Sequence, residues 1–167
     1  MTLSDVRRTA IEPALLLLPA RMTSAQAVVM LLAIQLQEDP QQHRRQVSGP
    51  ARGLWQFEEG GGTRGVLAHT ASRPHALAVC EALGITPTHT TVYWKLERND
   101  VLAAAFARLL LWTDPSGLPA IGEVERAFEL YIRTWRPGAY TRGSPAQKAS
   151  LRNKWSVNYA RAMELLV

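Results

Sequence analysis

The stretch from Ala25 to Gln37 constrains the fold most, because it is apolar on nearly every side of a helix. Thr23 or Ser24 supplies an N-cap before it. Asp39-Pro40 ends it, because proline pushes the preceding residue out of the α region. A helix without a polar stripe must be covered on all sides. The sequence therefore predicts a buried central helix with the rest of the chain packed around it.

Most of the remaining chain also has the apolar spacing and caps of helices. The further helices are predicted over residues 3–18 with a kink near Pro13, 63–70, 73–83, 88–98, 99–112, 122–135 and 144–166. Residues 41–57 are polar and contain glycine and proline, which favours a loop with a small β-hairpin. A chain of 167 residues suffices for one core. We expect a single, mainly α (α+β) domain over 1–167.

The formal net charge of +5 favours binding to polyanions such as nucleic acid, anionic lipid or a bacterial cell wall. Charge alone does not choose among them. The chain has no zinc-finger, RNP or basic-zipper pattern. Nucleic acid is therefore the least favoured of these partners.

The sequence predicts neither a metal site nor a membrane-spanning segment. Cys80 is the single cysteine, so neither an intramolecular disulfide nor a cysteine-based zinc site can form. The four histidines lack the HxxxH and HExxH spacings, which predicts no metal site. The Ala14–Leu18 run between two prolines is too short for a signal peptide or a membrane span.

Glu38 stands at the end of the apolar helix. Apolar neighbours and the negative end of the helix dipole both disfavour the ionised carboxylate and keep a proton available near neutral pH. A general acid that acts on a glycosidic oxygen needs this property. The alternative is a glutamate that simply points into solvent.

Two segments resemble the soluble lytic transglycosylases and goose-type lysozymes. They are Leu32-Ala33-Ile34-Gln35-Leu36-Gln37-Glu38 and Gly49-Pro50-Ala51-Arg52-Gly53-Leu54-Trp55-Gln56-Phe57. The resemblance implies a lysozyme-like fold in which Glu38 is the catalytic residue at the end of the central helix. Two positions depart from the family pattern, since Asp39 replaces a serine and Trp55 replaces a methionine.

The resemblance also implies roles in substrate binding. Gln56 would contact the glycan near the acid, Gly53 would allow close approach, and Trp55 would stack on a sugar face. The alternative is an edge strand with Trp55 and Phe57 facing the core and Gln56 on the other face. Tyr131 is a weaker candidate, because the family's Tyr-Asn-Ala-Gly segment is missing and an aromatic core residue would serve as well.

A second carboxylate would decide the type of reaction. Asp39, Glu58 and Glu59 are the candidates, although Glu58 and Glu59 adjoin three glycines and fit solvated charges equally well. The resemblance implies chemistry with one glutamate that protonates the leaving oxygen and then assists an internal attack. Plain hydrolysis is the nearest alternative.

The resemblance implies an enzyme that cleaves the β-1,4 bond between N-acetylmuramic acid and N-acetylglucosamine in peptidoglycan, and this chemistry needs no cofactor. Without an export signal, we expect a bacteriophage endolysin or a murein-degrading virion component that is delivered to the wall and contacts other virion proteins. The alternatives are an inactive structural or wall-binding protein with the same fold and a basic helical nucleic-acid-binding protein. The cleft-side arginines either form a solvated face or attract stem-peptide carboxylates: Arg44, Arg45, Arg52 and Arg64.

Overall fold

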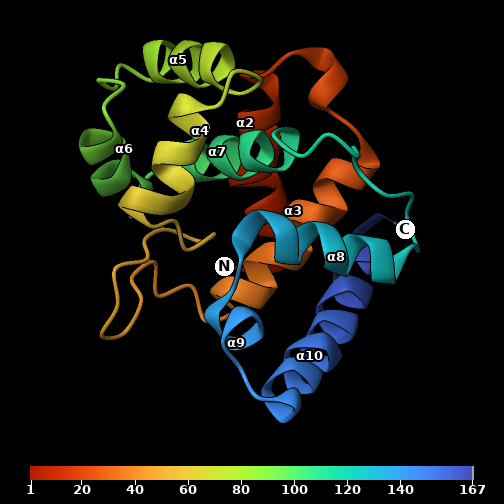
Figure 1. Ribbon diagram of the computed structural model, residues 1–167. Coiled ribbons are helices and arrows are strands. Elements are labelled where there is room, and N and C mark those ends of the chain that lie inside the picture. Colours follow the sequence, from red (N-terminus) through yellow and green to blue (C-terminus); the bar gives the residue numbers. More distant parts are fainter. Residues whose placement is uncertain (167) are drawn as a thin grey trace.

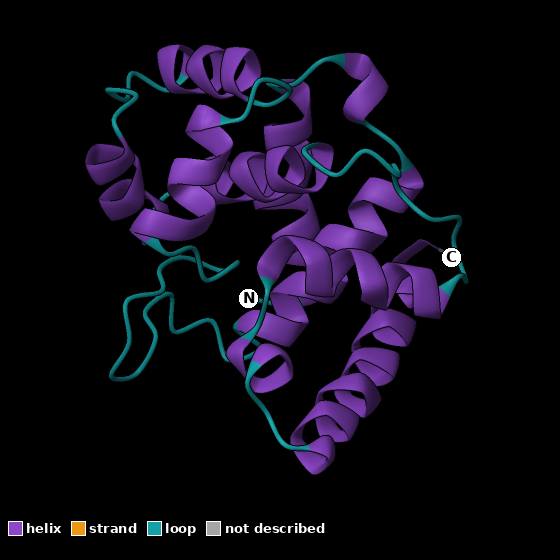
Figure 2. Cartoon of the chain, in the orientation of Figure 1, coloured by secondary structure: helices purple, strands orange, loops and turns teal. Residues whose placement is uncertain are grey.

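The computed structural model describes residues 1–166, which form helices and connecting loops (Figures 1 and 2). The longer helices are α3 (Ala25–Glu38), α5 (Arg73–Ala82), α6 (His89–Leu96), α7 (Asp100–Trp112), α8 (Val124–Trp135) and α10 (Pro145–Met163). The shorter helical segments are α1 (Leu3–Val6), η1 (Arg7–Ile11), α2 (Glu12–Leu16), η2 (Ala20–Met22), η3 (Glu59–Thr63), α4 (Arg64–Ala68), α9 (Gly138–Thr141) and η4 (Glu164–Leu166). The predicted mainly α class is confirmed.

Helix α3 is the predicted central helix. Ser24 caps it, since its hydroxyl accepts a 3.1 Å hydrogen bond from the backbone N–H of Ala27. Every residue from Ala27 to Gln37 is buried, so the helix is covered on all sides as its composition requires. Only at Glu38 does α3 regain partial exposure.

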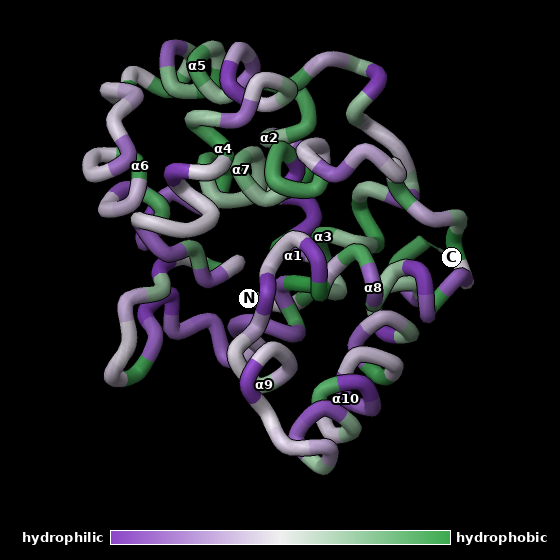
Figure 3. Tube along the Cα trace, in the orientation of Figure 1, coloured by the Kyte–Doolittle hydropathy of each residue, from purple (hydrophilic) through white to green (hydrophobic). Residues whose placement is uncertain are grey.

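One group of helices surrounds α7. The body of α7 is buried from Leu102 to Leu109, and Asn99 caps it through a 2.9 Å bond from the Leu102 N–H. It packs against η1, α2, α4, α5 and α6. In Figure 3 much of α7 has the colours of hydrophobic residues, whereas the 41–52 loop is mostly hydrophilic.

A second group consists of α8, α9 and α10, and α10 packs along α3 (Figure 1). Trp155 and Tyr159 of α10 are at most 1% exposed, so this face of the helix lies in the core. The Trp155 ring stacks on Tyr131 of α8 with centroids 4.9 Å apart and planes 12° apart. Helix α8 is thereby fixed beside the end of α3.

Several local predictions differ from the structure. The helix expected over 3–18 is divided into α1, η1 and α2, with the π-helical η1 ending two residues before Pro13. Ser72 directly precedes the predicted 73–83 helix and is expected to cap it, but its hydroxyl instead donates a 2.7 Å bond to the Val66 carbonyl. Within residues 1–166 the 41–57 segment forms no strand and has only two isolated antiparallel bridges, Arg45 with Arg52 and Arg52 with Phe57.

Among the helices of residues 1–166, none combines the length and the apolar character that crossing a membrane requires.

Candidate functional site

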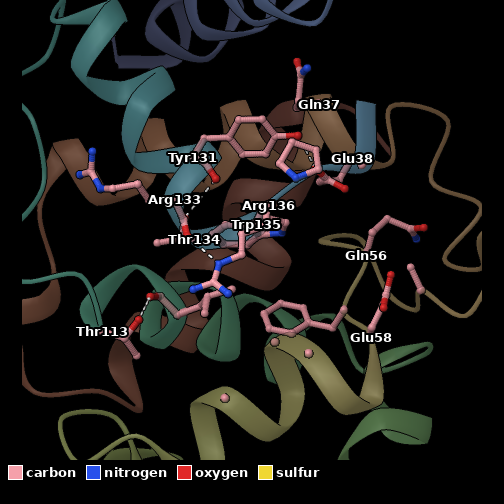
Figure 4. Close-up of a pocket in the computed structure, with 18 of the residues that line it drawn as sticks. Gln37, Glu38, Gln56, Glu58, Thr113, Tyr131, Arg133, Thr134, Trp135 and Arg136 are labelled. Atoms are coloured by element: carbon pink, nitrogen blue, oxygen red, sulfur yellow. Dashed lines mark hydrogen bonds between the residues drawn. The ribbon is translucent and has the colours of Figure 1, made fainter. Parts of the chain in front are cut away.

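A cavity of about 1010 Å³ opens where α3 ends, between the 56–62 segment and the α8–α9 turn (Figure 4). Its size matches that of the largest small-molecule pockets. Its charged lining comprises three acids and three arginines, namely Glu38, Glu58, Asp114, Arg133, Arg136 and Arg142. The cavity is therefore large enough for a ligand that carries several chemical groups.

Glu38 has the properties of a proton donor. Burial raises the pKa of its carboxyl to about 7, and the hydrogen bond from Tyr131 and the positive charge of Lys154 only partly oppose that rise. The side chain nevertheless lines the cavity, so a ligand can reach it. A carboxylic acid that keeps its proton near neutral pH and faces a cavity is suited to general acid catalysis.

Tyr131 fixes this carboxyl in place. Its hydroxyl donates a 2.5 Å hydrogen bond to Glu38 Oε1, while its ring is 1% exposed. Burial and then the charge of Glu38 raise the pKa of the phenol, so it remains a donor. The sequence left two roles for Tyr131 as alternatives, an aromatic core residue and a residue near the acid. In the structure Tyr131 has both roles.

Helix α10 also holds the end of α3. Lys154 Nζ donates a 2.9 Å bond to the Gln37 carbonyl, and Asn158 Nδ2 donates a 2.8 Å bond to Gln37 Oε1. A cation at a helix C-terminus is favourable, because the last carbonyls have no partner inside the helix. These bonds limit how far the Glu38 backbone can move.

Gln56 lines the same cavity as Glu38, and both are labelled in Figure 4. Its backbone has a φ of 51°, and its amide donates a 2.9 Å bond to the Gly53 carbonyl. Trp55 and Phe57 on either side are buried. The alternative of an edge strand is therefore wrong, because the segment is a turn, although Gln56 does lie in the cavity wall and its aromatic neighbours in the core.

Trp55 does not stack on a ligand, contrary to prediction. The whole residue is 0% exposed, and its indole N–H donates a 2.8 Å bond to the Leu31 carbonyl of α3. A large apolar ring is more stable in the core once its one polar group has a partner. Trp55 thus connects the 41–57 segment to the central helix.

Gly53 does not line the cavity either. Its φ is 77°, and a Cβ at this position would lie 2.5 Å from the Leu96 carbonyl oxygen. The glycine is required by the turn and by close packing on α6, and not by the approach of a substrate.

The three candidates for a second carboxylate have different surroundings in the structure. Asp39 accepts bonds of 2.9 and 2.8 Å from the backbone N–H groups of His43 and Arg44, so it stabilises the loop. Glu59 is outside the cavity and accepts a 2.6 Å bond from the Thr90 hydroxyl. Glu58 is exposed and lines the cavity, so it alone of the three remains a candidate.

The four arginines predicted beside the cleft do not line it. Arg44 forms a 2.7 Å ion pair with Asp100, whereas Arg45 and Arg52 both lie 3.1 Å from Glu97. Their charges are used to attach the 41–52 loop to α6 and α7. None of the four lies in the cavity lining, as attraction of substrate carboxylates would need, and the exposed Arg64 fits the alternative of a solvated face.

The sequence analysis missed Trp135, Arg136 and Arg142 as cavity residues. Trp135 is partly buried, its N–H donates a 2.9 Å bond to the Trp55 carbonyl, and its ring stacks on Tyr131 at 30°. It follows Tyr131 by four residues in a predicted helix, and this spacing places both on one face. This spacing could have identified Trp135 as a neighbour of Tyr131, whereas no sequence pattern pointed to the two arginines.

Comparison of the chain with protein-family models, with curated proteins and with solved structures gives no match.

Proposed function

We propose that this protein cleaves the β-1,4 glycosidic bond between N-acetylmuramic acid and N-acetylglucosamine in peptidoglycan, with Glu38 as the acid. The observation that carries the proposal is a carboxyl with a pKa of about 7 on the wall of a cavity of about 1010 Å³. Such a group donates a proton at neutral pH, which an ordinary glutamate does not.

The reaction proceeds in two proton transfers. Glu38 first gives its proton to the bridging oxygen as the bond to the anomeric carbon breaks. The resulting carboxylate then removes the proton from the C6 hydroxyl of the same sugar, whose oxygen bonds to the anomeric carbon. The product ends in a 1,6-anhydro ring, and Glu38 is protonated again.

The other cavity acids favour this single-glutamate route. Asp114 lies 2.9 Å from Arg133, which together with Ser116 lowers its pKa to about 2. It therefore stays ionised and paired. Glu58 is exposed beside Gly60 and Gly61, and no hydrogen bond or ion pair within residues 1–166 fixes its side chain as a base would require.

Trp135 supplies an aromatic wall for the sugar. Its indole N–H is already bonded to Trp55, so the ring is held by that bond and by its contact with Tyr131. An aromatic ring of fixed orientation beside the acid is suited to packing against the apolar face of a sugar. In this proposal Trp135 has the stacking role that the sequence analysis expected of Trp55.

The fold supports a lysozyme-like interpretation in two respects. A buried helix ends in the acid, and the cavity lies where this helix meets the α8–α9 turn and the loop after residue 52. The proposed setting is a bacteriophage endolysin or a virion component that reaches peptidoglycan glycan strands.

The direct test is to incubate the purified protein with peptidoglycan and to identify the released muropeptides by mass spectrometry. Glu38→Gln keeps the size of the side chain and an acceptor for Tyr131 but has no proton to give. Glu59→Gln is the matched control, because Glu59 is an acid outside the cavity. We expect 1,6-anhydro products from the wild type and from Glu59→Gln, and none from Glu38→Gln.

Other outcomes separate the alternatives. Reducing-end products would show hydrolysis. Wild-type protein that cosediments with peptidoglycan without releasing products would favour a wall-binding protein. Binding to DNA that weakens steeply with salt, without cleavage of peptidoglycan, would favour the nucleic-acid alternative.

A further inference from the structure

The end of the cavity at the α8–α9 turn is positively charged. Arg133, Arg136 and Arg142 line it, and Arg133 is neutralised by the ion pair with Asp114. Within residues 1–166, neither Arg136 nor Arg142 has an acidic oxygen within 4.0 Å, although both are exposed to solvent. Two positive charges in this cavity thus lack an acidic partner among residues 1–166.

Arg136 has an unusual backbone. It follows the last residue of α8 with φ 48° and ψ 54°, which is the left-handed conformation that glycine normally provides at this point of a helix. A residue with a Cβ pays about 1 kcal/mol or more for this conformation. Of the five such non-glycine residues in residues 1–166, Gln56 and Arg136 line the cavity. Strained residues that gather at a cavity point to function.

The local chain directs Arg136 into the cavity. Pro137 follows at once, and the Arg136 Nε donates a weak 3.4 Å bond back to the Arg133 carbonyl. Arg142 lies against the same turn, because its Nη2 is 2.8 Å from where a Cβ on Gly138 would be. In Figure 4 the Arg136 guanidinium extends away from Glu38. It therefore faces a part of the ligand other than the bond being cleaved.

We propose that Arg136, supported by Arg142, binds a carboxylate carried by the substrate and so selects acidic glycan strands over neutral ones. This inference rests on the proposed function. A guanidinium fits a carboxylate because two parallel N–H donors meet two oxygens. The carboxylate is either that of muramic acid, which is free only where no peptide is attached, or one on the attached peptide, and both sources share this chemistry.

Binding, measured without turnover, tests the proposal. Glu38→Gln is titrated calorimetrically with three tetrasaccharides: a neutral N-acetylglucosamine oligomer, a muramyl oligomer stripped of peptide by an amidase, and a muramyl oligomer with peptide. Adding Arg136→Gln should weaken binding of the acidic oligomers about 10- to 100-fold, as expected for a charged hydrogen bond. It should leave the neutral oligomer unchanged. Arg98→Gln is the matched control, because the Arg98 side chain is 90% exposed and does not line the cavity.

A second variant tests whether the strain serves binding. Arg136→Gly should lose the same affinity while the melting temperature rises, because glycine adopts this backbone freely. A loss confined to the peptide-bearing oligomer would assign the carboxylate to the peptide. A loss confined to the peptide-free oligomer would assign it to muramic acid, whose carboxyl is an amide wherever a peptide is attached. An equal loss for both acidic oligomers would show that the site binds either carboxylate.

Three results would overturn the inference: equal losses for the neutral and acidic oligomers, no loss with Arg136→Gln, or no binding of any oligomer. Failure of the proposed function is a different result. If only the proposed function is wrong, the wild type releases no products from peptidoglycan. In that case Glu38→Gln still prefers the acidic oligomers, and adding Arg136→Gln still abolishes that preference.

Discussion

The Tyr131 hydroxyl donates a 2.5 Å hydrogen bond to Glu38 Oε1 and so joins α8 to the end of the central helix. This bond stabilises the ionised carboxyl and lowers its pKa against the larger effect of burial. The acid is thus held in place and kept titratable near neutral pH by one contact.

Tyr131→Phe should raise the pKa of Glu38 above its value of about 7, because the opposing hydrogen bond is lost and burial remains. Carbon-13 NMR titration of the labelled glutamate carboxyls measures this directly. Tyr140→Phe is the control, since Tyr140 is only partly buried and does not bond to Glu38. An unchanged or lower pKa in Tyr131→Phe would show that the bond does not tune the acid.

Lys154→Met should shift the same titration in the same direction, because the positive charge of Lys154 also lowers the pKa of Glu38. The variant keeps the length of the side chain but removes the charge and the bond to the Gln37 carbonyl. Lys148→Met, which removes a charge elsewhere on α10, should leave the titration unmoved. If both variants shift it equally, the effect is one of overall charge and not of Lys154.

The stability of the protein should fall as the pH rises through the window set by Glu38. Its pKa is about 7 in the folded state against 4.5 ordinarily, so the folded state binds more protons between these values. Stability is then greatest below about pH 4.5 for this group and decreases up to about pH 7, by about 3 kcal/mol at most.

Glu38→Gln should remove this decrease and unfold at higher denaturant than the wild type at about pH 8. Urea denaturation of both proteins at several pH values measures the difference, in which contributions from other groups cancel. A constant difference between the two proteins across the window would mean that Glu38 titrates normally.

Gly53→Ala should destabilise the protein by about 2 kcal/mol or more, because the backbone strain at φ 77° adds to a clash with the Leu96 carbonyl 2.5 Å away. Gly84→Ala is the matched control, with a similar φ of 66° but no atom within 4 Å. It should cost only about 1 kcal/mol. Equal costs in thermal denaturation would show that the contact with Leu96 is not important.

The central helix and its acid could be predicted because both depend on local patterns. The uninterrupted apolar residues from Ala25 to Gln37 require burial, and Pro40 sets the end of the helix. Neither the apolar residues nor Pro40 predicts that Glu38 lies beside a cavity, because that depends on how α8 packs in three dimensions. Tyr131 is distant in sequence, and nothing local indicates that its hydroxyl reaches the acid.

The tryptophans show why the rest of the site was harder to predict. Trp55 and Trp135 are equally suited to stack on a sugar, and only the three-dimensional packing decides which is buried. The same holds for the arginines. Arg44 and Arg45 find carboxylates on α7 and just after α6, more than 50 positions later, whereas Arg136 finds none within residues 1–166. Long-range ion pairs of this kind leave no periodic pattern in a sequence.

The most direct test of the central claim is the initial rate of muropeptide release from peptidoglycan as a function of pH, with products identified by mass spectrometry. We predict 1,6-anhydro products from the wild type, a rate that falls above about pH 7 as Glu38 loses its proton, and no products from Glu38→Gln. Release by Glu38→Gln at the wild-type rate, or no release by either protein, would contradict the account.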